Sequence, residues 1–272
     1  MIKIIKLNAR RALCSSHSTA IAHVLILEGT ALLSALISSL AYGILSFDGL
    51  WRDLRFPPAE AVWTSGIILF IFFAFIAPFA AGVRAWYYRL SEKGQGEAIS
   101  FSFIPYENAA TFFNCIKLSL VLTFKKFFTY ALFTCIPAAI TFYAKSYLSI
   151  AQTPRESFLA YGSLICGTAL TLLTAFFAYT SCLKYFAVPY IFAENGFSNV
   201  KEAFKISQEA CRDEKGALLI FNISLLFYYI LNLCPVTALY SYPYIQSAKA
   251  IYARFLLEKL KRQQIDFQNN KL

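Results

Sequence analysis

The sequence predicts an all-α fold, a polytopic helical membrane bundle of about six transmembrane helices with one additional interfacial helix. Composition is the first reason: hydrophobic residues make up 58% of the chain and charged residues 15%, against usual values of about 45–50% and roughly 25%. The second is that long uncharged segments recur, and a helix needs about 20 apolar residues to cross the hydrocarbon layer. A soluble protein could not bury this much apolar surface, so we expect lipid to cover it.

We expect residues 1–272 to form a single membrane domain, because no polar stretch is long enough to build a second core. Prolines, charges and glycine-containing polar segments separate the apolar runs and predict where the helices end. The expected spans lie near residues 21–47, 61–83, 127–144, 157–183, 217–231 and 236–252.

Residues 108–124 are apolar apart from Lys117 and are followed directly by Lys125 and Lys126. Two interpretations are open, a span or a helix lying in the membrane interface. Because the next expected span begins at Phe127 without a turn, we favour the interfacial helix.

The last apolar block, residues 216–248, carries no charge. As a single helix it would extend roughly 50 Å, which is too long for one crossing. Asn232 and Pro235 lie near its middle, so we predict a helical hairpin that turns at residues 232–235.

An aromatic segment follows the second expected span, with Trp86, Tyr87 and Tyr88 between Arg84 and Arg89. Amphipathic rings and long basic side chains are typical of the membrane–water interface. We therefore expect an interfacial belt at this position.

The net charge of +10 supports a definite topology. If the N-terminus is cytoplasmic, most Lys and Arg residues fall in cytoplasmic segments, and the outside loops hold Arg52, Arg55, Lys145 and Arg155. This distribution predicts a multi-pass protein of the cell membrane with both termini in the cytoplasm. The lipid bilayer is then the main partner, with anionic lipid headgroups at the cytoplasmic face, and we expect no nucleic acid partner.

Enzyme and metal signatures are missing from the sequence. The seven cysteines form no C-x-x-C pair, and His17 and His23 have no cluster of other ligands around them. We found no H-E-x-x-H motif, no nucleophilic serine motif and no phosphate-binding glycine loop. We therefore expect no enzymatic activity, no cofactor and no metal site.

Residues 199–212 predict a polar amphipathic helix, since Asn199 and Glu202 form a variant of the capping box. One face carries Val200, Ala203, Phe204, Ser207, Ala210 and Cys211 at helical spacing. The opposite face carries Lys201, Lys205, Glu209 and Arg212. This helix is either a connector lying against the membrane or the bundle, or a contact helix that docks a protein partner from the cytoplasm.

Glu28 is an acidic residue inside the apolar run of the first expected span. A lone carboxylate at a helix centre costs on the order of 2.5–3.5 kcal/mol, and less near the interface. Glu28 either reaches back to headgroup water or forms an intramembrane ion pair. Lys184 is our first choice of partner, because the topology places both residues on the inner-leaflet side.

Several short motifs resemble a known family. They are LNARRAL at residues 7–13, RAWYYR at 84–89, PYIFAE at 189–194, YPY at 242–244 and AIY at 250–252. In these the chain resembles an uncharacterised family of bacterial polytopic integral membrane proteins, which is similar to the membrane domain of glycerophosphodiester phosphodiesterases. The resemblance implies a six-helix membrane domain and no assigned reaction.

Two function classes are compatible with the sequence. The first is a non-catalytic integral membrane protein of the bacterial cytoplasmic membrane that acts by association in the envelope. The second is a small transporter or permease, which needs polar groups at the bilayer midplane to coordinate its substrate. The middles of the expected spans consist mainly of Leu, Ile, Phe, Ala and Thr, which favours the first class.

Overall fold

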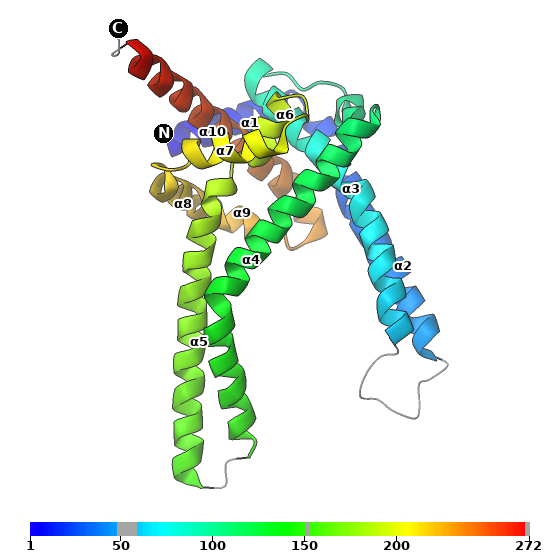
Figure 1. Ribbon diagram of the computed structural model, residues 1–272. Helices are drawn as coiled ribbons and strands as arrows, with labels where there is room; N and C mark the ends of the chain where they lie inside the picture. The colour runs from blue at the N-terminus through cyan, green and yellow to red at the C-terminus, as the bar shows by residue number, and fades with distance from the viewer. Residues whose placement is uncertain (48–58, 151–152, 270–272) are drawn as a thin grey trace.

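The computed structural model describes residues 1–47, 59–150 and 153–269, and these residues form helices and turns without a strand. The all-α prediction is therefore confirmed. Two long hairpins project from one side of a compact helical layer, which we call the platform (Figure 1). The platform contains α1 (Ile2–Cys14), η1 (Ile99–Tyr106), η2 (Leu183–Tyr185), α6 (Val188–Glu194), α7 (Val200–Ala210), α8 (Lys215–Ser224), α9 (Leu226–Leu231) and α10 (Pro235–Asn269).

The hairpins consist of the four longest apolar helices in the described ranges. The first pairs α2 (His17–Phe47) with α3 (Ala59–Lys93), and the second pairs α4 (Ala109–Leu148) with α5 (Pro154–Cys182). All four are long and apolar enough to cross a membrane. Both chain termini lie on the side of the molecule opposite to the hairpin tips (Figure 1).

The hairpins leave large apolar side chains exposed. Phe142 of α4 and Phe158 of α5 are 74% and 78% exposed, and leucines along α2 are similarly open. If such a side chain faced water, the folded protein would be about 1.5–3 kcal/mol less stable than with the same side chain buried. This surface is the expected one for helices surrounded by lipid.

The structure shows that residues 108–124 do not form a separate helix, and their interfacial position stays a prediction. These residues and the expected span 127–144 belong to one continuous helix, α4, which Asn108 caps by accepting a hydrogen bond from the Ala110 N–H at 2.9 Å. Lys125 and Lys126 do not interrupt it, and the Lys125 side chain lies against the platform. The Nζ of Lys125 is 4.2 Å from the centre of the Phe204 ring.

The predicted turn at residues 232–235 lies between two helices, as α9 ends at Leu231 and α10 begins at Pro235. The expected span 217–231 is instead divided into two short helices that break at Leu225. At 1.5 Å per residue α8 is roughly 15 Å long, half the hydrocarbon thickness. The count of six spans is therefore not confirmed, and four candidate spans lie in the described residues.

The aromatic segment that was expected to form an interfacial belt is the inner end of α3, and it is buried inside the protein. Trp86 and Tyr87 are completely buried. The Trp86 indole N–H donates to the Glu97 carbonyl at 2.7 Å, which ties the segment after α3 back onto that helix. α3 packs against η1 and α10, and both rings also contact the His23 ring of α2, so they do not face the membrane–water interface as predicted.

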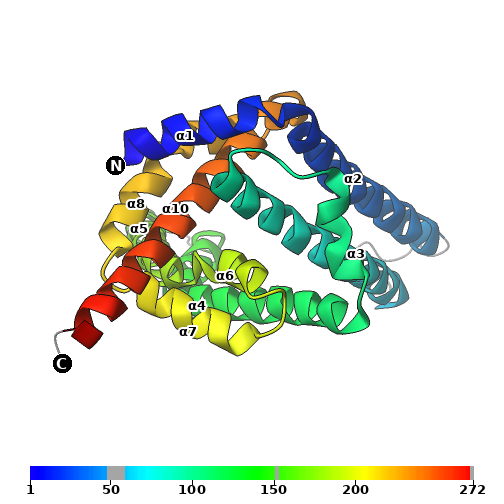
Figure 2. The ribbon, with the colours of Figure 1, turned by 90° about the horizontal axis from the view of Figure 1, so that it is seen from above.

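The platform brings the two ends of the sequence together. Figure 2 shows α10 crossing between α1 on one side and the α6–α7 pair on the other. The buried face of α1, which includes Ile5 and Ala9, packs on α10. The ammonium group of Lys6 donates to the carbonyl of Ser224 at 2.6 Å, so this base of the N-terminal helix stabilises the end of α8.

Candidate functional site

The outer face of α7 is the polar surface that the sequence indicated. Asn199 caps the helix by accepting a hydrogen bond from the Glu202 N–H at 3.2 Å. The predicted apolar face is the buried one, with Ala203 and Ser207 fully covered. Lys201, Lys205, Glu209 and Arg212 are all exposed, and we call this set the α7 face.

Polar contacts hold α7 and its neighbours in place beneath this face. The Ser207 hydroxyl donates to the Lys184 carbonyl at 2.9 Å, which fixes α7 to the end of the second hairpin. On the other side, Lys261 of α10 forms an ion pair with Glu194 at 3.0 Å. Lys259 pairs in the same way with Glu214. The α7 face is thus presented on a support that includes three separate parts of the chain.

The structure does not bring Glu28 and Lys184 together. Glu28 lies on α2 in the first hairpin and is partly buried, whereas Lys184 lies on η2 after the second hairpin. The Lys184 ammonium group is 5.0 Å from the centre of the Tyr185 ring. Within the described ranges, none of the ion pairs involves either residue.

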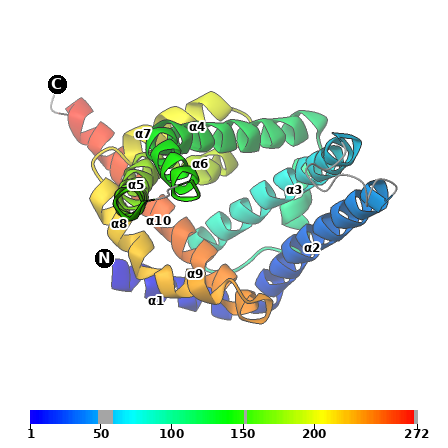
Figure 3. The same ribbon diagram turned by 90° about the horizontal axis from the view of Figure 1, so that it is seen from below.

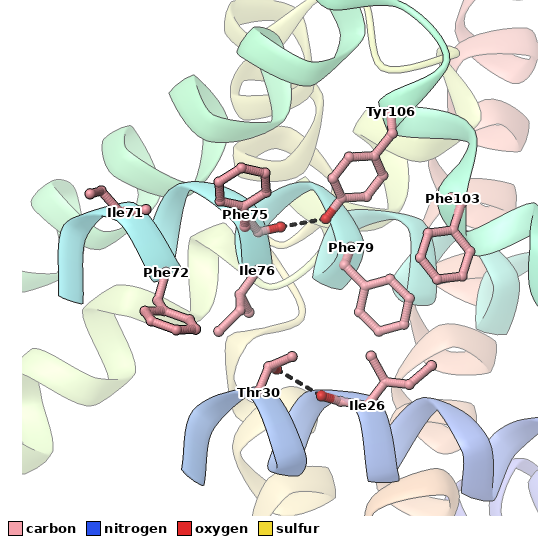
Figure 4. Close-up of a pocket in the computed structure, with 9 residues that line it drawn as sticks. All are labelled: Ile26, Thr30, Ile71, Phe72, Phe75, Ile76, Phe79, Phe103 and Tyr106. Carbon is pink, nitrogen blue, oxygen red and sulfur yellow. Dashed lines mark hydrogen bonds between the residues drawn. The ribbon is translucent and has the colours of Figure 1, made fainter. Parts of the chain in front are cut away.

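A cavity of about 380 Å³ opens between α2 and α3 (Figure 4). In this view Phe72, Ile76 and Phe79 of α3 point toward α2, and Tyr106 reaches the cavity from η1. Its two hydroxyls are occupied: Thr30 donates to the Ile26 carbonyl at 2.7 Å, and Tyr106 donates to the Phe75 carbonyl. The cavity therefore offers an apolar surface that suits a hydrocarbon chain.

Sequence reasoning overlooked the position of His23. Its Nε2 is 2.7 Å from the Ser102 hydroxyl, and the ring lies edge-on to Trp86 with the ring centres 4.9 Å apart. Both His23 and Ser102 are fully buried. No sequence signal pairs them, because they are brought together only when η1 packs on the first hairpin. Among the described residues His23 belongs to no cluster of three metal-ligating side chains, so the pair is a buried hydrogen bond within the core.

The chain matches no protein-family model, no curated protein and no solved structure. Any function must therefore be inferred from the residues of this chain. In the part of the chain that the structure describes, no three His, Cys, Asp or Glu side chains gather into a possible metal site.

Proposed function

We propose that this chain is a non-catalytic integral protein of the bacterial cytoplasmic membrane that binds a cytoplasmic protein through its platform. The observation that carries the proposal is the separation of two surfaces. The hairpins expose apolar side chains, while the α7 face exposes charged ones at the end of the molecule that holds both termini. A charged surface at the end of the molecule away from the apolar hairpins is available to a cytoplasmic partner.

We also propose four spans, with α8 and α9 lying along the inner membrane surface. Ile223 and Phe227 of these short helices are exposed and apolar, which suits contact with lipid at the interface. Four spans keep both termini on one side, as six would. The excess of Lys and Arg near the platform supports a cytoplasmic position for that side.

The polar groups of the second hairpin favour association over transport. Thr134 and Thr168 donate to the carbonyl four residues earlier in the same helix, at 2.8 Å and 2.7 Å. Thr141 does the same with the Pro137 carbonyl at 2.9 Å. Hydroxyls used in this way have no proton left to donate to a solute, and only their oxygen lone pairs remain.

Site-specific photo-crosslinking in living cells tests the proposal. A photoreactive residue in place of Lys205 should give a defined protein adduct, and one in place of Lys145, near the tip of the second hairpin, should not. The adduct should be lost when Lys201 and Arg212 are changed to Glu, because charge reversal removes the complementarity of the surface. These side chains are exposed, so the melting temperature should change little. An adduct that survives the reversal, or none at all from Lys205, would refute binding through the α7 face.

A further inference from the structure

A second cavity, of about 600 Å³, lies where the second hairpin meets the platform, and we call it the cationic cavity. Two lysines line it, Lys126 from α4 and Lys249 from α10. The described residues that line it include Tyr and Asn side chains and many apolar ones, but no Asp or Glu. Its volume lies within the range of roughly 300–1,000 Å³ that small-molecule sites occupy.

The positive charge in this cavity has no acidic partner. None of the ion pairs among the described residues includes Lys126, Lys249 or Arg84. Burial, followed by the nearby charges of Arg84 and Lys126, lowers the pKa of Lys249 to about 8. The two lysines that line the cavity repel each other, and an anion placed between them would remove that cost.

Neighbouring side chains hold the Lys249 ammonium group in position. It lies 5.1 Å from the centre of the Tyr229 ring, a cation–π geometry. The Tyr229 hydroxyl donates to the Asn222 side-chain oxygen at 3.4 Å, and the Asn222 amide donates to the Leu218 carbonyl at 2.9 Å. This chain of contacts links α8, α9 and α10 around the cavity.

The cavity lies at the depth of lipid headgroups if the tip of the second hairpin reaches the outer surface. From Lys126 to Leu148, α4 rises roughly 33 Å at 1.5 Å per residue, close to the ~30 Å of the hydrocarbon layer. Lys126 would then be at the inner boundary of the hydrocarbon. Lys125, beside it, contacts the platform through the Phe204 ring.

The mouth of the cavity continues into apolar surface. Phe176 of α5, Ile223 of α8 and Leu226 of α9 line the cavity and are also largely exposed. A ligand that uses both parts must combine an anionic group with hydrocarbon. A free phosphorylated solute would leave the apolar wall in contact with water.

We propose that the cationic cavity binds the phosphate group of an anionic phospholipid from the cytoplasmic leaflet, between Lys126 and Lys249. An acyl chain of the same lipid lies along Phe176, Ile223 and Leu226. This site is separate from the α7 face, so lipid binding can fail while partner binding holds, and the reverse.

Native mass spectrometry of the full chain, purified in detergent and mixed with defined lipids, tests the site. Phosphatidylglycerol should be retained, and diacylglycerol, which has the chains but no phosphate, should not. Each of Lys126→Ala and Lys249→Ala should weaken retention about fivefold, because a base near a membrane surface contributes about 1 kcal/mol toward anionic lipid. Lys125→Ala is the matched control: it removes a neighbouring base that does not line the cavity, and retention should stay within about twofold.

Two further variants keep the test informative if Lys249→Ala does not fold. Lys126→Arg should retain the lipid, and Leu226→Trp should reduce retention by filling the mouth without changing charge. Equal retention of phosphatidylglycerol and diacylglycerol would overturn the recognition of phosphate. If inorganic phosphate alone displaced the lipid completely and Leu226→Trp had no effect, the ligand would be a free anion, and the assignment to a lipid would be wrong.

Discussion

Gly82 of α3 lies against the backbone of Ser102 in η1, at the point where η1 covers the inner end of the first hairpin. A Cβ atom at position 82 would collide with the Ser102 carbonyl. The contact allows the Ser102 hydroxyl to reach His23, 2.7 Å away, in the buried centre of the platform. A single hydrogen atom in place of a side chain therefore determines how closely these two segments approach.

We expect Gly82→Ala to lower the free energy of unfolding of the purified protein by about 1–3 kcal/mol, and with it the melting temperature. The reason is that backbone atoms must move to admit the methyl group. Gly66→Ala on the same helix is the control. Nothing lies within 4 Å of a Cβ at that position, so the better helix propensity of Ala should leave stability equal or slightly raised. Thermal unfolding in detergent measures both, and equal melting temperatures would show that η1 does not pack as closely as described.

Single residues differ in how well the sequence predicts their surroundings. The buried and exposed faces of α7 follow from spacing alone, because the helix rests on one surface and its pattern records which side is covered. Trp86 and Tyr87 could not be placed in the same way. Their rings contact His23 of α2, which is distant in sequence, and an aromatic segment beside arginines is equally typical of an interface.

At the scale of helices, composition predicts apolar segments better than it predicts their continuity. The pair Lys125–Lys126 suggested a boundary, yet α4 runs through it, since long basic side chains can extend to polar surroundings from within a helix. In the opposite case, residues 217–231 were expected to form one span, and the structure divides them between α8 and α9. An apolar helix packed on a protein surface and one immersed in lipid have similar sequences.

Cys234 distinguishes the two topologies of α8 and α9. In a variant that keeps this one cysteine, an impermeant thiol reagent added to intact cells should leave it unlabelled if the short helices lie along the inner surface. The residue is exposed, so the reagent should label it once the membrane is permeabilised. Ser149→Cys, at the tip of the second hairpin in the same background, should be labelled from outside. External labelling of Cys234 would restore the six-span arrangement.

At the scale of the whole molecule, the hairpins are joined mainly through the platform. The tips of the two hairpins are well apart (Figure 1 and Figure 3), and α3 and α4 contact each other near the platform, where the Phe75 and Phe112 ring centres are 6.5 Å apart. Within the second hairpin the helices pack closely, as the Thr141 and Thr171 hydroxyls are 3.5 Å apart and Gly167 leaves room for Thr141. Small residues allow this approach between membrane helices.

Disulfide crosslinking in membranes tests this arrangement. A Thr141→Cys/Thr171→Cys pair should crosslink readily under mild oxidation, because the two Oγ1 atoms, whose places the sulfurs would take, are 3.5 Å apart. Leu36→Cys/Phe142→Cys, one residue on each hairpin, should give little intramolecular product. Comparable yields from the two pairs would mean that the hairpins close on each other in the bilayer.

The contact of α1 with α10 also sets an order of events during biosynthesis. At about 5–20 residues per second, the ribosome reaches α10 roughly 10–45 s after it completes α1. Both hairpins are translated in this interval, while the apolar face of α1, with Ile5 and Leu13, still lacks its partner. Insertion into the membrane therefore precedes closure of the platform. During that delay the nascent chain depends on the membrane surface or a chaperone to shield its N-terminal helix.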